Sequence, residues 1–324
     1  MLIERMKTIK IKFCDWHPSF DLCNNWITKL LEKHFSLEFS DDPEYIFYSV
    51  WGTEHLKYNG IRIFYTAEDI SPDFNLCDYA FGFDLISFED RYLRFSRLIS
   101  GDRLIPAANK HLFTEEDLAK KTGFCDYVVS NGNGDPIRTE IFYKLSEYKK
   151  VDAGGRYLNN IGGRVEDKLD FQSRHKFSIA FENGAQPGYT TEKIVDAFAA
   201  KTIPIYWGNP EIAKDFNPGS FVNYWDYGNL DDMIARVIEI DNDDALYRSI
   251  LATPIFEDGR IPERFRVETA EAFLLHICSQ PLDQASRRCR YTWRARYELD
   301  RMDWKRIVDK SGKILPRIAL KLTK

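Results

Sequence analysis

Polar side chains that can bind a ligand follow directly after the apolar run Phe177–Phe181. A polar loop ends at Gly188, and Tyr189, Glu192 and Lys193 then open a segment with helical spacing. The N-terminus of a helix favours anions because it carries free N–H groups and the positive end of the helix dipole. A glycine just before it lets a ligand approach the backbone. We therefore predict a site for a phosphate-bearing ligand here.

The elements around these residues form a predicted strand–helix–strand unit. Phe177–Phe181 has the composition of a buried strand, and Thr190 or Thr191 can cap the helix. The run Thr202–Trp207 returns as a second strand before Gly208-Asn209-Pro210. In open parallel sheets ligands bind at the carboxyl ends of the strands, which is where this loop lies.

The rest of the chain has the alternation of strands and helices that is typical of α/β proteins with largely parallel sheets. The first half predicts strands at Lys7–Cys14, Tyr45–Trp51, Gly60–Thr66 and Tyr79–Phe83, and a helix at Leu22–Phe35. The second half predicts helices at Thr114–Lys121, Arg138–Leu145 and Leu230–Ile240, a strand at Asp126–Ser130 and a flexible loop at Lys149–Gly163. We expect the domain boundary near residues 110–125.

Composition excludes several classes of protein. The 324 residues suffice for two domains, and 44% apolar with 29% charged residues is typical of globular proteins. No stretch approaches the ~18–20 apolar residues of a membrane span, and the N-terminus lacks the apolar core of a signal peptide. The six cysteines form no Cys-x-x-Cys pair, which favours free thiols over disulfides or a zinc site. The dinucleotide fingerprint and the P-loop are also absent; Gly132-Asn133-Gly134 is interpreted as a turn.

Charge is distributed unevenly along the chain. Residues 287–324 hold 13 Lys and Arg against 4 Asp and Glu, whereas the rest holds 32 against 46. On a helical wheel Trp293, Tyr297, Trp304, Ile307 and Val308 share one sector, together with Asp300. Such a segment either lies on an anionic membrane surface or packs as a solvated helix across the body.

Three long motifs resemble one known family. They are FENGAQPGYTTEKIVDAF followed by TIPIYWGNP, the earlier FYTAEDISPDFNLCDYAFGFD, and VVSNGNGDPIRTEIFYKL. Together they span roughly residues 60–225 and resemble the α1,3/4-fucosyltransferases of glycosyltransferase family 10. The resemblance implies two facing Rossmann-like domains of the GT-B type, with the active site in the interdomain cleft. It implies an acceptor-binding domain at 1–120, a GDP-fucose-binding domain at 121–286, and a basic aromatic tail at 287–324.

The resemblance also assigns roles to single residues. Glu68 would be the general base that takes the proton of the acceptor hydroxyl, as inverting transfer requires. Without the resemblance, Glu68 would be interpreted as an exposed loop carboxylate. The donor-binding roles fall on Arg138, Tyr189, Glu192, Lys193 and Asn183. Arg138 and Lys193 would hold the diphosphate with a hydroxyl from Tyr189, Glu192 would accept hydrogen bonds from sugar hydroxyls, and Asn183 would border the guanosine beside Glu182.

The implied activity is an inverting α1,3- or α1,4-fucosyltransferase that needs no metal or other cofactor and uses GDP-fucose as donor. Its partners would be GDP-fucose and an oligosaccharide acceptor containing N-acetylglucosamine, in bacterial lipopolysaccharide or capsule with Lewis-type structures; no nucleic acid is expected. The expected location is the cytoplasm, with residues 290–324 as a candidate peripheral contact to the inner face of a bacterial membrane. The alternatives are a GT-B enzyme with another nucleotide sugar and an inactive nucleotide- or glycan-binding module.

Overall fold

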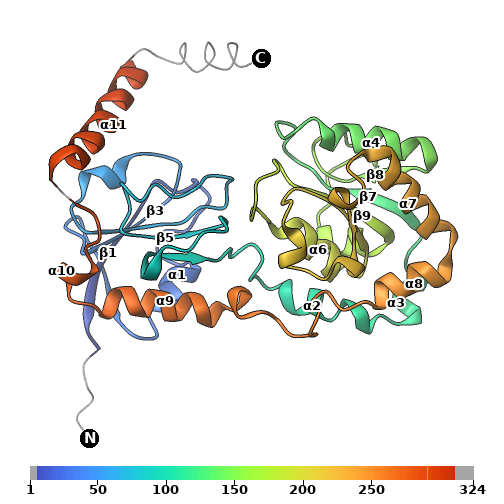
Figure 1. Cartoon of the computed structure of the whole chain (residues 1–324), viewed down its shortest axis with the longest axis horizontal. Coiled ribbons are helices and arrows are strands. Elements are labelled where there is room, and N and C mark those ends of the chain that lie inside the picture. The colour runs from blue at the N-terminus through green and yellow to red at the C-terminus, as the bar shows by residue number, and fades with distance from the viewer. Residues whose placement is uncertain (1–5, 290, 311–324) are drawn as a thin grey trace, which may run out of the picture. The chain divides into compact units, whose positions relative to one another are not determined.

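The computed structural model describes residues 6–289 and 291–310 and divides into two compact units. Unit 1 comprises the described residues of Met1–Gly82, Ser87–Leu93 and Ala270–Lys324, and unit 2 comprises Phe83–Ile86 and Arg94–Thr269 (Figure 1). The prediction of two α/β domains with parallel sheets is confirmed.

Unit 1 is built on a six-stranded sheet in the order β2-β1-β3-β4-β5-β6. The strands are β1 (Thr8–Cys14), β2 (Ser36–Phe39), β3 (Tyr45–Tyr48), β4 (Ile61–Phe64), β5 (Tyr79–Gly82) and β6 (Tyr92–Arg94). The pairs from β2 to β5 are parallel. Every residue of β3, β4 and β5 is buried, as expected for parallel strands that are covered on both faces.

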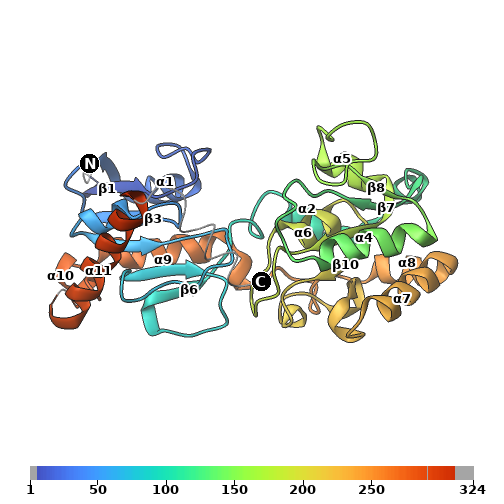
Figure 2. The ribbon, with the colours of Figure 1, turned by 90° about the horizontal axis from the view of Figure 1, so that it is seen from above.

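Helices from both ends of the chain complete unit 1. They are α1 (Trp26–Leu31), α9 (Val267–Ser279), α10 (Leu282–Ala285) and α11 (Thr292–Lys310). The helix predicted at Leu22–Phe35 is shorter because the side chain of Asn25 caps its start and forms a capping box with Thr28. Phe273 of α9 packs edge-on against Phe81 of β5, with ring centroids 5.0 Å apart. Figure 2 shows α9 running along the sheet of unit 1.

Unit 2 contains a five-stranded parallel sheet in the order β11-β10-β9-β7-β8. The strands are β7 (Gly123–Tyr127), β8 (Val151–Ala153), β9 (His175–Phe181), β10 (Ile203–Trp207) and β11 (Val222–Asn223). Its helices are α2 (Leu104–Ala108), α3 (Glu115–Ala119), α4 (Ile137–Tyr148), α5 (Lys168–Ser173), α6 (Glu192–Ala199), α7 (Leu230–Asn242) and α8 (Asp244–Ala252). Short 3-10 turns in the two units lie at Glu54–Lys57, Glu89–Arg91, Lys110–Leu112, Ile212–Lys214, Pro218–Ser220, Tyr224–Asp226 and Glu263–Phe265.

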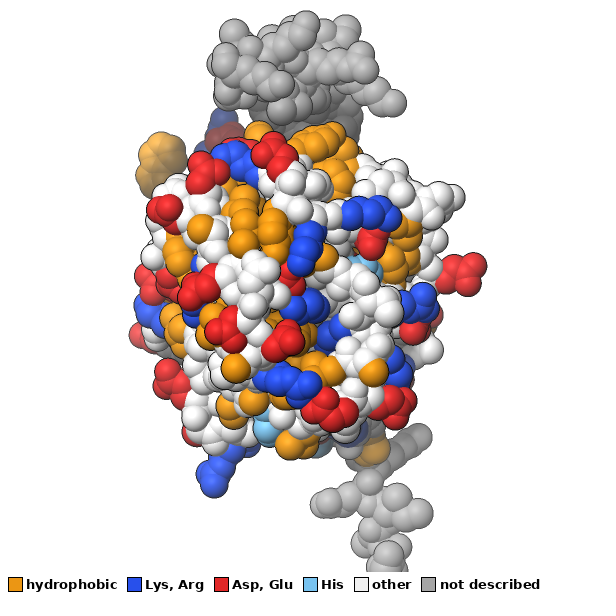
Figure 3. All heavy atoms as spheres, turned by 90° about the vertical axis from the view of Figure 1, so that its right-hand side faces the viewer, with side chains coloured by type: hydrophobic (Ala, Val, Ile, Leu, Met, Phe, Trp, Pro, Cys, Tyr) orange, Lys and Arg blue, Asp and Glu red, His pale blue; other side chains and the backbone are white. Residues whose placement is uncertain are grey.

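The sheet of unit 2 carries a separate hydrophobic core on each face. Alternate residues of β9 point to opposite sides, so that Ile179 joins the core with α4, α7 and α8 while Ala180 joins the core with α2 and α6. The face of the molecule seen in Figure 3 carries acidic and basic side chains interspersed with small apolar areas. Among the described residues no helix is long and apolar enough to cross a bilayer.

The boundaries of the units differ from the predicted domains 1–120, 121–286 and 287–324. Residues 94–120 belong to unit 2 because α2 buries Leu104 and Ala107 against the core under α6. Residues 270–286 belong to unit 1 because α9 buries Leu274 and Ile277 there. The predicted boundary at residue 120 therefore lies about 30 residues after the point where the chain passes from unit 1 to unit 2. Unit 1 is built from both ends of the chain.

Four strands were not predicted from the sequence: β2, β6, β8 and β11, of which β11 is only two residues long. β2 lies at the edge of its sheet and is largely exposed, so it has no buried alternation. β6 is only three residues long. β8 lies in the segment Lys149–Gly163, which was predicted to be a loop because of its glycines. In the tail, α11 extends over Thr292–Lys310, whereas the side chains of Trp304, Ile307 and Val308 and all of 311–324 lie outside the described residues.

Candidate functional site

The sheet of unit 2 reverses its strand order between β7 and β9. The chain leaves β7 through α4 to reach β8 on one side, and it leaves β9 through α6 to reach β10 on the other. The two loops therefore run in opposite directions from the carboxyl ends of these strands, which is the usual ligand position in open parallel sheets. The loops touch where the Asp135 amide donates to the Asn183 carbonyl at 3.0 Å. All five predicted donor-binding residues lie on these loops and the first turns of α4 and α6.

Arg138 lies in the first turn of α4 and is buried, with 4% of its surface exposed. Its Nη1 donates to the Asn131 carbonyl at 3.3 Å, and its Nε has no hydrogen-bond partner among the described residues. A side chain at position 134 would overlap this guanidinium, which explains why a glycine occupies this position. A buried cation with an unused donor at a helix N-terminus is unfavourable unless an anion binds there.

Lys193, in the first turn of α6, is held in place by a buried carboxylate. Its Nζ donates to Glu182 Oε2 and to Thr191 Oγ1, both at 2.8 Å. Burial works against the charge, but Glu182 and Glu192 beside it raise the pKa of Lys193, whereas the charge of Arg138 lowers it. Lys193 is therefore an ammonium ion close enough to Arg138 to interact with it electrostatically.

Glu182 has a structural role that the sequence patterns did not reveal. The family resemblance implies a position beside the guanosine with Asn183, which stays a prediction, and the side chain itself is fully buried at the end of β9. Its two oxygens accept hydrogen bonds from the Thr191 amide and the Thr191 hydroxyl, each at 2.7 Å, and from the Lys193 ammonium. The carboxylate thus holds Thr191, the residue before α6, in place and is the counterion of Lys193. An acidic residue that continues a buried strand directly was the available signal.

Glu192 is partly exposed, with its carboxylate 3.9 Å from Lys193 Nζ. Burial alone would raise the pKa of this carboxyl, but Lys193 and Lys168 lower it below its usual value. Glu192 is therefore ionised and can only accept hydrogen bonds, which suits the hydroxyl groups of a ribose or a hexose.

Tyr189 lies deeper than expected for a residue that touches a phosphate. It is 2% exposed, and its ring packs edge-on against Phe83 with centroids 4.9 Å apart. Gly188 before it has φ +91°, and a Cβ there would overlap the Phe83 carbonyl, so only glycine fits. Asn209 holds the turn by accepting the Gly188 amide at 2.7 Å. The phosphate contact of Tyr189 stays a prediction, as does the guanosine contact of the half-buried Asn183.

Glu68 lies in unit 1, four residues after β4 and at the carboxyl edge of that sheet. Its amide donates to Thr66 Oγ1 at 3.0 Å and its carbonyl accepts the Ile70 amide at 2.8 Å, so a tight turn fixes its backbone. The side chain is exposed, as a base that must meet a substrate requires. The order of this sheet reverses between β1 and β3, and the loop after β3 presents Trp51 with 54% of its surface exposed.

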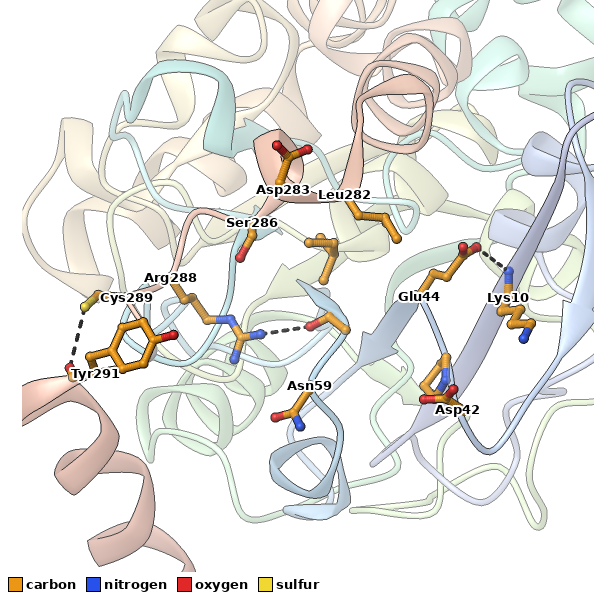
Figure 4. A pocket seen from close by; sticks show the side chains of 13 residues that line it. Lys10, Asp42, Glu44, Asn59, Leu282, Asp283, Ser286, Arg288, Cys289 and Tyr291 are labelled. Carbon is orange, nitrogen blue, oxygen red and sulfur yellow. Dashed lines mark hydrogen bonds between the residues drawn. The ribbon is translucent and has the colours of Figure 1, made fainter.

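A wide hollow of about 870 Å³ lies at the opposite, amino edge of the unit 1 sheet (Figure 4). Glu44 and Asn59 line it from the sheet side, and Asp283 and Arg288 line it from the C-terminal segment. Arg288 donates to the Gly60 carbonyl at 2.8 Å and thereby ties this segment to the sheet. None of the six predicted site residues lines this hollow.

No cluster of three or more His, Cys, Asp or Glu side chains in the described part of the chain is arranged to hold a metal ion. The positive charge of the candidate site is supplied by Arg138 and Lys193.

Comparisons with known proteins agree across both units. The family described as "Alpha-(1,3)-fucosyltransferase FucT N-terminal domain" matches residues 11–99, and "Glycosyltransferase family 10 (fucosyltransferase) C-term" matches 118–253. The chain is 36% identical over 278 residues to the "Alpha-(1,3)-fucosyltransferase FucT" of Helicobacter pylori, with 72% of this chain and 58% of that protein covered. It is 33% identical to a "Putative fucosyltransferase" of Acanthamoeba polyphaga mimivirus, of which it covers 26%. The chain thus spans less than two thirds of these curated relatives.

Solved structures show the same likeness. A crystal structure of an α1,3-fucosyltransferase superposes with a TM-score of 0.74 at 31% identity and covers 86% of this chain and 92% of that one. The same kind of enzyme solved with GDP-fucose superposes with a TM-score of 0.71 at 30% identity, covering 86% and 93%.

Proposed function

Because the chain belongs to glycosyltransferase family 10, the fucosyltransferases, we propose that it transfers L-fucose from GDP-fucose to a hydroxyl group of a glycan. The observation that carries this proposal is the pair of cations at the switch point of unit 2. Among the described residues, Arg138 has a buried Nε without a partner, and Lys193 donates two hydrogen bonds, to Glu182 and Thr191, from its three N–H groups. Both therefore retain donors for a diphosphate.

The proposed chemistry uses these donors at the leaving group. As the bond between fucose and the β-phosphate breaks, negative charge grows on the departing GDP, and fixed cations stabilise it without having to reorganise. Arg138 suits this role because its planar guanidinium can present two donors to phosphate oxygens. Glu192 accepts hydrogen bonds from hydroxyl groups of GDP-fucose and offsets the positive charge that develops on the sugar ring. The nucleotide is thus held mainly by unit 2.

Glu68 of unit 1 is proposed as the general base. It removes the proton of the acceptor hydroxyl as that oxygen attacks the anomeric carbon from the face opposite GDP, so that β-linked GDP-fucose yields an α-fucoside. This assignment gives unit 1 the acceptor and unit 2 the donor. The turn that fixes the Glu68 backbone and the exposure of its side chain support this role.

The proposed acceptor is an N-acetylglucosamine-containing glycan of lipopolysaccharide or capsule, fucosylated to a Lewis-type structure through an α1,3 or α1,4 bond. The experiment is to incubate the chain with GDP-fucose, GDP-mannose, UDP-galactose or UDP-N-acetylglucosamine and with type 1 or type 2 disaccharides. We expect GDP release and an α-fucosylated trisaccharide, identified by NMR, only with GDP-fucose. Turnover of another nucleotide sugar would replace the proposed donor, and GDP binding without turnover would identify a binding module.

We propose a peripheral membrane role for the tail, at the inner face of a bacterial membrane. Its basic and aromatic composition supports this role, and Trp293 of α11 has 85% of its surface exposed. Part of the basic charge is structural, however, because Arg288 is buried against Asp78. A chain ending at Lys310, and one ending at Cys289, should sediment progressively less with anionic vesicles than the full chain. Equal sedimentation of all three would refute the contact.

A further inference from the structure

Arg94 and Asp215 form an ion pair within unit 2 that the proposed mechanism does not use. Nη1 and Nη2 of Arg94 donate to Oδ1 and Oδ2 of Asp215 at 2.6 and 2.5 Å. The side chain of Asp215 is 1% exposed and that of Arg94 is 17% exposed. A guanidinium that donates to both oxygens of a carboxylate is fixed in orientation as well as in position. Asp215 therefore determines where the other N–H groups of Arg94 point.

The same guanidinium also holds two backbone carbonyl groups. Nε donates to the Phe83 carbonyl at 2.9 Å, and Nη2 donates in addition to the Gly188 carbonyl at 3.1 Å. Among side chains, only that of arginine can serve these acceptors and a carboxylate together, because its planar fork carries five N–H groups at fixed angles. The chemistry thus requires an arginine at position 94.

Gly188 forms the turn that leads into the candidate donor site. Its carbonyl is held by Arg94, and its amide donates to Asn209 Oδ1 at 2.7 Å, so the turn is fixed from two sides. Tyr189 follows directly, and its ring packs edge-on against Phe83, whose carbonyl Arg94 also holds. A displaced Arg94 would therefore release both the turn and the surface on which Tyr189 packs.

A second arginine pairs with Asp215 without contacting this turn. Arg264 donates from Nε to Asp215 Oδ1 at 3.2 Å and from Nη2 to the Lys214 carbonyl at 2.6 Å. Within the described residues none of its hydrogen bonds reaches Gly188. The two arginines therefore share one buried carboxylate, but only Arg94 connects that carboxylate to the donor-binding loop.

We propose that Arg94 and Asp215 are positioning residues of the donor site. Asp215 orients Arg94, and Arg94 holds the turn at Gly188 and Tyr189 in the conformation that receives the diphosphate. The proposal rests on the GDP-fucose binding proposed above and adds two residues that act on the nucleotide through this turn. Because the turn leads into α6, its displacement also moves the first helical turn with Lys193, and the loss appears in nucleotide affinity.

Three variants separate this role from stability. Asp215→Asn keeps the shape of the side chain but replaces one acceptor oxygen by a donor, which breaks the paired contact with Arg94. Arg94→Lys keeps the positive charge for Asp215 but cannot serve the carboxylate and both carbonyl groups at once. Arg264→Met removes the other cation beside Asp215 and leaves the contact between Arg94 and Gly188 in place.

Asp241→Asn is the matched control in the same unit. The Asp241 side chain is 3% exposed and is likewise paired with two cations, Lys149 at 2.5 Å and Lys176 at 2.8 Å. Lys176 is the second residue of β9 and lies at the amino edge of the sheet, whereas the donor-binding loop follows the carboxyl end of this strand. The control therefore removes an equally buried charge far from the loop. Calorimetric titration of the full chain measures the Kd for GDP, steady-state kinetics measure kcat/KM for GDP-fucose, and thermal unfolding measures stability.

We expect Asp215→Asn and Arg94→Lys to raise the Kd for GDP and to lower kcat/KM for GDP-fucose, each about tenfold to 100-fold, because the groups that bind the nucleotide are misplaced. Asp241→Asn should lose a similar amount of stability and leave both quantities unchanged, as should Arg264→Met for GDP affinity. If Asp215→Asn does not fold, Arg94→Lys decides the outcome in the same titration.

Wild-type GDP affinity in folded Asp215→Asn and Arg94→Lys variants would overturn the proposal. An equal loss of affinity in Asp241→Asn or Arg264→Met would also overturn it, because the effect would then follow from lost stability or lost charge alone. If the wild type binds GDP but transfers no fucose, and Asp215→Asn weakens that binding, the proposed function fails while the positioning role stands.

Discussion

Replacing Lys193 by Met separates its structural from its functional role. Glu182 is fully buried and accepts the Lys193 ammonium at 2.8 Å, whereas the Lys193 side chain is 19% exposed. Breaking a buried ion pair from one side costs about 3–5 kcal/mol because a carboxylate stays behind without its counterion. Thr191 still donates twice to Glu182, so we expect a loss near the lower limit, about 3 kcal/mol of unfolding free energy.

The double variant Glu182→Gln/Lys193→Met removes both charges. It should recover at least half of the lost stability, because a neutral amide needs no counterion and can still bond with Thr191. Donor binding should behave differently. Lys193→Met removes a hydrogen bond to a charged phosphate, worth about 1.5–3 kcal/mol, which corresponds to an approximately 10- to 150-fold weaker affinity for GDP. The double variant should not regain this affinity.

Urea denaturation measures the first quantity and calorimetric titration with GDP the second. Lys201→Met is the matched control, since Lys201 pairs with Asp117 at 2.7 Å in the same unit with both side chains about one quarter exposed. It should cost about 1 kcal/mol or less and leave GDP binding unchanged. A Lys193→Met variant as stable as the control would refute the buried counterion. A double variant with full GDP affinity would refute the diphosphate contact.

Glu68→Gln should retain GDP-fucose affinity and lose essentially all transfer, because the amide cannot accept the hydroxyl proton; transfer near the wild-type rate would remove Glu68 as the base. Lys110 is buried and donates to the carbonyls of Ser220 and Ile250, and burial together with Lys121 lowers its pKa to about 7. The unfolded chain holds this proton up to about pH 10.5, so stability should rise with pH between about 7 and 10.5, and Lys110→Met should flatten that rise in urea titrations. Burial raises the pKa of Asp126 to about 6, so its carboxylate should destabilise the native state increasingly from about pH 3.8 to pH 6. Asp126→Asn should therefore exceed the wild type in thermal stability at pH 7.5, with the advantage vanishing near pH 4.

The strand–helix–strand unit around residues 177–207 was predictable because its signals are local. An apolar run of strand length, a polar loop and an amphipathic helix all lie within 31 residues, and the structure contains β9, α6 and β10 there. The clustering of Arg138 with Lys193 was implied by the family resemblance, and the neighbouring positions of β7 and β9 account for it.

The division into units was not predictable because it depends on contacts between distant segments. Nothing in the sequence near residue 270 indicates that the following helix completes the first sheet rather than the second. The partner of Lys193 was missed for a related reason. The family resemblance places Glu182 beside the guanosine, and no local pattern indicates that the folded chain turns its side chain inward toward Thr191.

Because the chain returns to unit 1 at its end, the order in which the two units can fold during synthesis is constrained. Asp78 is fully buried, and its carboxylate is paired with Arg288, which lies 210 residues later in the chain. At about 5–20 residues per second, roughly 10–40 s of synthesis separate the two partners. Unit 2 ends at Thr269 and is complete within that interval, so the nascent chain can close the second unit before the first. Until then the early strands have a buried acid without its counterion and an unfilled face where α9 belongs, which makes this interval the stage at which a chaperone would be needed most.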